Sequence, residues 1–403
     1  MFAIFMKVVV VTAYTPTPEN TRGISGLLYA ILRYRPKDVS VKIFSYNRNK
    51  IEDGERALIS AELNADIDVV KSPKWTNLFA NIWMGRFEKF FMKNHILCHV
   101  PNRKMAKILQ AEHANLVWVY PYFYYKYAKL MPQQRFVLTA CDCEALINVR
   151  RFETRRCLMD RKVLRHTYIM LKKGLHFESE WNLPNMKVHF VGKEDKSFYE
   201  RIYGYHNSYF IRHPHYSLTD KNINFSKPKL KVILTGGCDI YTEDDINLML
   251  PNIIKHKEEL LDHFEFTLLG KNWEPMKQEL EENKFECMYK AWVDDYAEEL
   301  VLHDIQIAPI SYGTGTKGKV LSALANGLLV IGSKYAFENI EVMNFDSCVQ
   351  YNRATEIAEL LLEVASNKKM YEEIAEKGRR QVRTYHNPKI ISQQFFETYA
   401  KQE

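Results

Sequence analysis

Short apolar runs of strand length alternate with amphipathic helical segments along the whole chain of 403 residues. A first series of such runs occupies residues 7–12, 39–45, 116–120, 136–140, 187–191 and 208–211, and a second occupies 230–235, 264–269, 305–309 and 328–331. Continuous apolar runs separated by helices are typical of parallel strands that are buried on both faces. We therefore expect an α/β fold with two Rossmann-like domains that face each other across a cleft.

A polar stretch without periodicity, residues 213–228, separates the two series and ends in Lys227-Pro228. Such a stretch is typical of a linker. The chain is also too long for one ordinary domain. We place an N-terminal domain at 1–213 and a C-terminal domain at 229–385.

The charge of the chain is unevenly divided. The net charge of +7 consists of +14 in residues 1–220 and −7 in residues 221–403. A basic half indicates an anionic partner, such as nucleic acid, an acidic membrane surface or a phosphorylated substrate. The basic residues are dispersed and no known nucleic-acid motif is present, so we expect no nucleic acid as a partner.

The seven cysteines are odd in number and scattered, which is typical of reduced thiols in a cytoplasmic protein. Cys141, Cys143, Cys157 and His166 lack the usual spacing of a zinc site, so we expect buried thiols and no metal there. No apolar run is long enough to span a membrane. The N-terminus lacks the basic start of a signal peptide and is expected to be the first strand.

A glycine-rich loop joins the strand at 305–309 to a helix at 318–325. Gly313, Gly315 and Gly318 allow backbone N–H groups to approach an anion, and the following helix presents the positive end of its dipole. Lys317 and Lys319 add two full positive charges. These residues predict a diphosphate site, with a tight turn and solvated lysines as the alternative.

This segment resembles the donor-binding signature of GT-B glycosyltransferases in the large group 1, or family 4, set. The matching residues are Pro309, Gly313, Gly315, Lys317, Lys319, Ala323, Ala325 and Gly327. Upstream, the order of Gly236-Gly237, Gly270 and Trp292-Val293-Asp294-Asp295 is also similar to the family. The resemblance covers residues 187–395 well and the N-terminal half loosely.

The resemblance implies a donor site for a nucleoside-diphosphate sugar and no cofactor or catalytic metal. It places in that site Gly236, Gly237, Gly270, Lys271, Trp292, Gly313, Thr314, Gly315, Thr316, Lys317, Lys319 and Ser322. Lys317 and nearby amides would hold the diphosphate. It also implies that the last segment, 386–403, is a helix that returns to the N-terminal domain.

Two positions depart from the family pattern. Ser322 and Thr314 stand where the family has two glutamates, of which the second usually binds the donor ribose. A serine hydroxyl binds a ribose hydroxyl more weakly than a carboxylate does. The usual assignment of a retaining reaction therefore does not carry over to this chain.

The acceptor side is expected in the N-terminal domain. The strand at 136–140 ends in Cys141-Asp142, where related enzymes often carry a His or Asp. Asp142 is the candidate catalytic residue, as a general base or an acceptor ligand, with a helix N-cap as the alternative. Arg22, Gly23 and Arg150 are candidate acceptor residues, although Arg150 could equally lie on a solvated helix face. Glu178 and Glu180 resemble a recurrent acidic position, with a surface role equally open.

An aromatic and basic segment at 75–91 has helical spacing. It is expected either to pack on the N-terminal sheet or to touch an anionic membrane, which would suit a lipid-linked acceptor.

We expect a cytoplasmic glycosyltransferase, in contact with the inner face of the membrane, that moves a hexose or related sugar to a saccharide or lipid-linked acceptor. The expected context is bacterial surface polysaccharide or glycolipid synthesis. Two alternatives stay open, a GT-B nucleotide-sugar epimerase and a catalytically inactive GT-B scaffold, and a third, a nucleic-acid-binding protein, is supported by no recognised motif.

Overall fold

The computed structural model describes residues 6–18, 20, 24–71 and 102–400, and these divide into two compact units. The first unit contains residues up to Val149, Arg165–Tyr216 and the segment from Pro388 onward, and the second contains Arg150–Leu164 and Ser217–Asn387. The sequence-based boundaries did not foresee that residues 150–164 cluster with the second unit. The segment at 75–91 and the residues Arg22 and Gly23 lie outside the described part of the chain.

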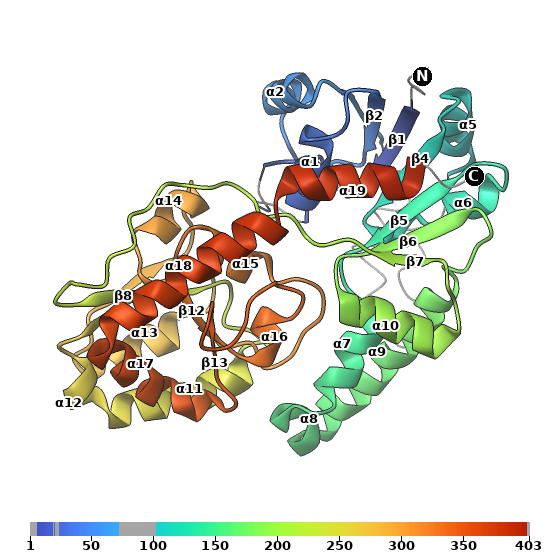
Figure 1. The fold of residues 1–403 in the computed structure, drawn as a ribbon. Coiled ribbons are helices and arrows are strands. Elements are labelled where there is room, and N and C mark those ends of the chain that lie inside the picture. The colour runs from blue at the N-terminus through green and yellow to red at the C-terminus, as the bar shows by residue number, and fades with distance from the viewer. Residues whose placement is uncertain (1–5, 19, 21–23, 72–101, 401–403) are drawn as a thin grey trace. The chain divides into compact units, whose positions relative to one another are not determined.

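The first unit is built on a seven-stranded parallel sheet with the order β3-β2-β1-β4-β5-β6-β7 (Figure 1). Its strands are β1 (Met6–Thr12), β2 (Val39–Ser45), β3 (Asp66–Val69), β4 (Leu116–Tyr120), β5 (Phe136–Ala140), β6 (Met186–Phe190) and β7 (Ser208–Phe210). Its helical segments are α1 (Gly26–Arg33), α2 (Asp53–Leu63), α5 (Arg103–Ala111), η1 (Tyr122–Tyr124), α6 (Tyr127–Leu130), α7 (Glu144–Arg151), α9 (Arg161–Ser179), α10 (Lys193–Tyr203) and α19 (Pro388–Ala400), of which α7 and α9 cross the division between the units.

Strand β1 shows why this sheet needs helices on both faces. Val8 and Val10 belong to one apolar core, and Val9 and Val11 belong to another on the opposite face, all four fully buried. The C-terminal helix α19 contributes to the first of these cores, because the Phe395 ring packs on Trp118 with ring centroids 4.3 Å apart. Figure 1 shows α19 next to α1, and the Ser392 hydroxyl donates to the Ile31 carbonyl at 2.6 Å.

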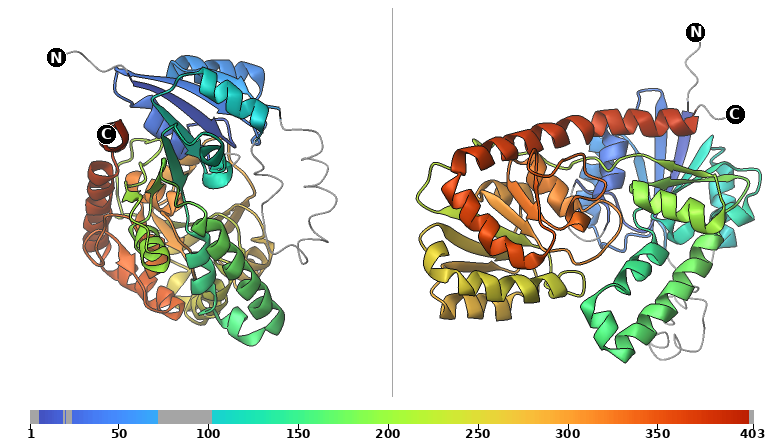
Figure 2. Two further views of the ribbon diagram at one scale, coloured as in Figure 1. Left: turned by 90° about the vertical axis from the view of Figure 1, so that its right-hand side faces the viewer. Right: turned by 60° about the horizontal axis from the view of Figure 1, so that its bottom comes forward.

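The second unit has a six-stranded parallel sheet with the order β10-β9-β8-β11-β12-β13, and helices cover both of its faces (Figure 2). Its strands are β8 (Leu230–Thr235), β9 (Phe264–Leu269), β10 (Cys287–Lys290), β11 (Ile305–Ala308), β12 (Leu329–Gly332) and β13 (Val349–Gln350). Its helical segments are α8 (Arg155–Met159), α11 (Glu243–Lys255), α12 (Lys257–Leu260), α13 (Glu274–Glu282), α14 (Tyr296–Val301), α15 (Gly318–Ala325), α16 (Lys334–Phe337), η2 (Ala354–Glu356), α17 (Ile357–Ser366) and α18 (Lys368–Tyr385).

Two parallel α/β sheets with covering helices confirm the predicted pair of Rossmann-like units. In the described ranges, no helix is both long and apolar enough to cross a lipid bilayer. The six described cysteines are free thiols, and within the same residues no three His, Cys, Asp or Glu side chains are grouped so that they could hold a metal ion.

Candidate functional site

The strand order of the second unit fixes where a ligand can bind. The chain leaves β8 toward β9 on one side, whereas β11 pairs with β8 on the other side. The loops that follow β8 and β11 therefore diverge, and in parallel α/β sheets ligands bind at the carboxyl ends of the strands at such a switch point. The first loop begins with Gly236-Gly237, and the second contains the glycine-rich segment 309–317.

Glycines bring the loops after β8 and β9 into direct contact. Gly236 has φ +105° and Gly270 has φ +130°, in the left-handed region that favours glycine. The Gly236 N–H donates to Leu269 O at 2.9 Å, and its carbonyl accepts from the Trp273 indole at 2.8 Å. The Lys271 carbonyl in turn accepts from the Cys238 N–H at 3.0 Å. The two loops thus form one compact rim of the candidate donor site, which contains the predicted residues Gly236, Gly237, Gly270 and Lys271.

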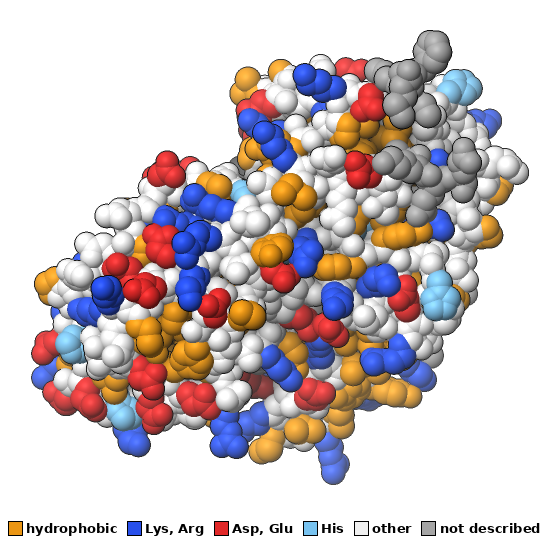
Figure 3. Space-filling model, viewed as in Figure 1, with side chains coloured by type: hydrophobic (Ala, Val, Ile, Leu, Met, Phe, Trp, Pro, Cys, Tyr) orange, Lys and Arg blue, Asp and Glu red, His pale blue; other side chains and the backbone are white. Residues whose placement is uncertain are grey.

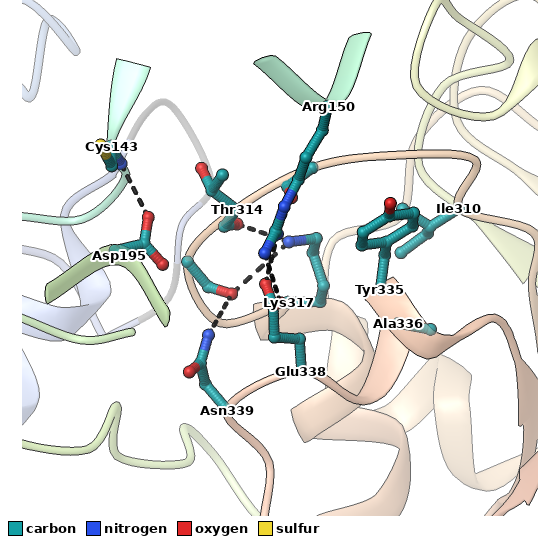
Figure 4. A network of polar contacts seen from close by, with 12 residues as sticks. Cys143, Arg150, Asp195, Ile310, Thr314, Lys317, Tyr335, Ala336, Glu338 and Asn339 are labelled. Atoms are coloured by element: carbon teal, nitrogen blue, oxygen red, sulfur yellow. Dashed lines mark hydrogen bonds and ion pairs between the residues drawn. The ribbon is translucent and has the colours of Figure 1, made fainter. Parts of the chain in front are cut away.

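The glycine-rich loop after β11 is braced by its own side chains. The Lys317 ammonium donates to the Thr314 carbonyl at 2.5 Å, with the Gly315 carbonyl at 3.5 Å, and Asn339 donates to Gly315 O at 3.0 Å (Figure 4). Gly315 has φ +65°, which the turn requires. In this structure Lys317 therefore braces the loop, and the direct contact with the diphosphate that the resemblance implies stays a prediction.

Lys319 joins the two loops at the switch point. It is the second residue of α15, and its Cδ and Cε lie 3.7 and 3.8 Å from where a Cβ on Gly236 would be. The surrounding protein displaces water and lowers the pKa of the Lys319 ammonium, and the negative charge of Asp239 opposes this shift. The Lys319 side chain is exposed at the N-terminus of α15, where a bound diphosphate would add negative charge to that of Asp239.

The other predicted donor residues differ in exposure. Thr314 and Ser322 are buried, 4% and 6% exposed, whereas Trp292 is 62% exposed and Thr316 is half-buried. The Ser322 hydroxyl lies one helical turn after Lys319 on α15, on the same side of the helix. The two positions that lack the family's glutamates therefore lie within the folded loop and helix.

Arg150 lies in the second unit by its contacts and is engaged by protein groups (Figure 4). Its guanidinium binds Glu338 with two contacts of 2.6 and 2.7 Å and donates to the Gly313 carbonyl at 2.5 Å. The Arg150 side chain is only 13% exposed, so the alternative of a solvated helix face is wrong. This paired guanidinium supports the glycine-rich loop through Gly313.

The candidate catalytic residue Asp142 lies in the first unit, at the end of β5. Helix α7 begins two residues later, and its first N–H groups are bound by carboxylates from outside the helix. Asp195 accepts from the Cys143 N–H at 2.8 Å, and Glu178 accepts from the Ala145 N–H at 3.0 Å. The helix start is therefore stabilised by distant acids.

Glu178 is completely buried, so the alternative of a surface role is wrong for this residue. It also accepts from the Tyr203 hydroxyl at 3.0 Å and from the Cys143 thiol at 3.3 Å. Burial raises the pKa of Glu178 from 4.5 to about 7, although these three donors oppose the shift. Glu180, by contrast, is partly exposed and pairs with Lys129 at 2.8 Å.

The raised pKa of Glu178 predicts a pH dependence of stability. The folded state holds the proton between pH 4.5 and about 7 whereas the unfolded state releases it, so this group's contribution is largest below pH 4.5 and is lost as pH rises through 7. The loss is about 3 kcal/mol or less, at 1.4 kcal/mol per pKa unit. In Glu178→Gln the side chain stays neutral at every pH. Melting curves from pH 5 to 8 should therefore show that the melting temperature of the variant increases relative to that of the wild type as pH rises. Parallel profiles would contradict a raised Glu178 pKa.

Sequence reasoning missed Asp195, Glu338 and Asn339. Each acts through a partner far away in the chain, for example Arg150 and Glu338, which are separated by 188 positions. No local pattern marks such pairs. Only Asp195 could have been suspected from the sequence, because acidic residues are common in the first turn of a helix. Its partner, Cys143, also follows the strand end at which the sequence indicated Asp142.

The comparisons with known proteins agree with this architecture. No protein-family model matches the chain. A search of curated proteins found no match either. Among solved structures, the chain is similar over 98% of its length to all of HepE from Anabaena in complex with UDP, with a TM-score of 0.66 and 11% identity. It is also similar to a glycosyltransferase from Rickettsia africae (99% of each chain, TM-score 0.64, 13% identity) and to WaaG, a glycosyltransferase involved in lipopolysaccharide biosynthesis (98% of this chain and all of WaaG, TM-score 0.60, 12% identity).

These likenesses extend over both units and define the class of fold. The chain has the GT-B fold, as the resemblance of its glycine-rich segment implied.

Proposed function

We propose that this protein is a glycosyltransferase that uses a nucleoside-diphosphate sugar as its donor. The observation that carries the proposal is that Lys319, at the start of the helix after β11, lies beside Gly236 at the carboxyl end of β8. Backbone amides, a helix N-terminus and a lysine together suit a diphosphate. HepE, which has the same fold, has been crystallised with UDP-glucose and with UDP.

The chemistry that these residues can supply is electrostatic. As the sugar leaves the donor, negative charge grows on the nucleoside diphosphate, and Lys319 with the N-terminus of α15 would stabilise it without a metal or other cofactor. Lys317 would act by holding the loop amides in place. On the acceptor side, Asp142 would take the proton from the attacking hydroxyl.

The donor is identified by a binding screen. We expect thermal stabilisation of the wild-type protein by one class among UDP-, GDP-, ADP- and CMP-sugars, and by the matching free diphosphate, in metal-free buffer containing a chelator. A ligand at 100 times its Kd stabilises a protein by about 2.7 kcal/mol, which is a measurable shift. The absence of stabilisation by any of the four at millimolar concentration would contradict a donor site.

Two alternatives share the fold and the binding step. An inactive scaffold is favoured by Thr314 and Ser322, which replace carboxylates. It would bind a donor but release no nucleoside diphosphate in the presence of acceptor extracts. A nucleotide-sugar epimerase would change the sugar of the donor and transfer nothing. Chromatography of the donor and its products after incubation separates these outcomes.

The acceptor is proposed to be a saccharide or lipid-linked saccharide, used in surface polysaccharide or glycolipid synthesis at the cytoplasmic face of a membrane. A feature of α8 supports contact with an anionic membrane. Leu158 and Met159 are 72% and 76% exposed, and the exposed cations Arg155, Arg161 and Lys162 flank them. Figure 3 shows hydrophobic and basic side chains together over α8. Exposed apolar groups between cations suit the surface of an anionic bilayer.

The membrane contact predicts a specific loss of vesicle binding. The double variant Leu158→Ser/Met159→Ser should bind vesicles containing phosphatidylglycerol at least about tenfold more weakly than the wild type, since each apolar side chain contributes about 1.5–3 kcal/mol when buried. Met343→Ser, which changes a residue that is 63% exposed elsewhere in the second unit, is the matched control. Equal flotation of the double variant and the control would contradict the contact.

A further inference from the structure

The second unit contains an open cavity of about 620 Å³ away from the glycine loops. It is lined by Asp220, Lys221 and Asn222 from the linker, and by Glu376, Arg379, Arg380 and Arg383 from α18. Figure 3 shows Lys and Arg side chains gathered along α18. Four of the seven lining residues are cations, which indicates an anionic ligand.

Two of these cations build the walls of the cavity. Arg379 donates to the Lys221 carbonyl at 2.7 Å and makes a two-point contact with Glu376 at 2.6 and 2.7 Å. The Lys221 ammonium turns inward to the His303 carbonyl and lies 3.5 Å from buried Asp304. These pairs fix the linker against α18 and are not available to a ligand.

The remaining cations, Arg383 and Arg380, can bind a ligand. Arg383 Nε donates to the Ala325 carbonyl at 2.9 Å, but its Nη2 is shielded from solvent and has no hydrogen-bond acceptor among the described residues. A buried donor without an acceptor is destabilising, so a ligand that draws Arg383 toward the cavity and supplies an acceptor would be favoured. Arg380, three positions earlier on the same helix, is exposed and adds a second guanidinium.

Two acids line this cavity. Burial and the charge of Arg379 lower the pKa of Arg383, and the charges of Asp220 and Glu376 oppose this shift. Glu376 is already bound by Arg379, which leaves Asp220 as the carboxylate without an arginine partner in the cavity lining. Two guanidinium groups against one carboxylate leave the ligand-facing part of the cavity positive. Arginine recognises phosphate oxygens through paired N–H donors, whereas a carboxylate or chloride offers fewer acceptors.

The cavity also contacts the far end of the helix that carries Lys319. Ala325 is the last residue of α15, and the next residue, Asn326, accepts from the Thr219 N–H of the linker at 2.8 Å. Arg383 therefore lies at the negative end of the α15 dipole, which it stabilises. A ligand that draws Arg383 toward the cavity acts on the end of α15 opposite to the candidate donor site.

We propose that this cavity is a second anion site, which binds the phosphate group of a small phosphorylated ligand through Arg383 and Arg380. The site is separate from the donor site and does not depend on the proposed function. Its ligand is a free phosphate monoester or the phosphate of a lipid headgroup, and the shared chemistry is a phosphate with accessible terminal oxygens.

The test is calorimetric titration of the full chain without sugar nucleotide, using inorganic phosphate, glucose 6-phosphate and phosphatidic acid vesicles at constant ionic strength. We expect binding of at least one probe, a tenfold or greater loss in Arg383→Met, a smaller loss in Arg380→Gln, and a gain in Asp220→Asn. Lys369→Gln, which removes one exposed charge from the same helix, should bind as the wild type does. Free phosphate and vesicles distinguish the two ligand sources.

The proposal fails if no probe binds beyond a matched chloride control, or if the Lys369 and Arg380 variants lose equal affinity, which would indicate a general charge effect. Arg380 is exposed, so Arg380→Gln keeps the test valid even where Arg383→Met fails to fold. Binding of the sugar nucleotide to Arg380→Gln should be unchanged, which separates this site from the donor site.

Discussion

Replacing Lys319 with methionine should lower kcat/KM for the donor identified by the binding screen by about 100- to 1,000-fold, the usual cost of removing one group that stabilises transition-state charge. Methionine keeps most of the length and apolar stem of lysine, so the space beside Gly236 stays filled and only the positive charge is lost. Because the charge on the leaving diphosphate grows in the transition state, kcat should fall together with kcat/KM. Steady-state release of the nucleoside diphosphate measures both constants.

The controls separate a local effect from a loss of net charge. Lys255→Met removes one exposed lysine from the end of α11 and should leave both constants unchanged. Lys317→Met should act differently, because the Lys317 ammonium braces the carbonyls of Thr314 and Gly315. We expect it to loosen the loop and raise KM as well as lower kcat. If Lys319→Met keeps kcat/KM within threefold of the wild type, the diphosphate does not bind at this switch point.

The central strands of both sheets could be predicted from the sequence because they are buried on two faces. For β2, β4, β5, β8 and β9, the apolar runs coincide with the observed bounds. Three strands that the runs did not indicate, β3, β10 and β13, all lie at sheet edges. An edge strand pairs on one side only and can expose part of its surface, as in Asp66–Val69, so these three carry no continuous apolar run, whereas the run at 208–211 did indicate the edge strand β7.

The candidate donor site could be predicted in part because its residues are close together in the sequence or follow strands. The glycines and lysines of 313–319 are contiguous, and parallel topology places Gly236 and Gly270 at the same edge of the sheet. The partners Glu338 and Asn339 could not be predicted, since each reaches the loop from a different element. The contact of Lys317 with the Thr314 carbonyl could not be predicted either, because a sequence does not show which backbone groups a lysine reaches.

The glycine at position 270 should be the least replaceable residue of this site. A Cβ on Gly270 would lie 1.8 Å from the Gly236 carbonyl oxygen, and φ +130° is a conformation that other residues rarely adopt. The backbone has no room to shift, because Gly270 N–H donates to Lys290 O at 2.9 Å and Gly236 N–H donates to Leu269 O at 2.9 Å. We therefore expect Gly270→Ala to destabilise the second unit by about 3–5 kcal/mol.

Such a loss corresponds to a fall in melting temperature of roughly 6–20 °C for a unit of this size, at 2–4 °C per kcal/mol. Calorimetry gives this value, and donor affinity should fall with it, since the displaced Gly236 carries the rim of the site. Gly237→Ala is the matched control in the same loop, because a Cβ there would lie 3.6 Å or more from its neighbours and the residue has no left-handed φ. If both alanine variants melt within 2 °C of the wild type, the loops after β8 and β9 do not pack against each other as described. The proposed rim of the donor site would then be wrong.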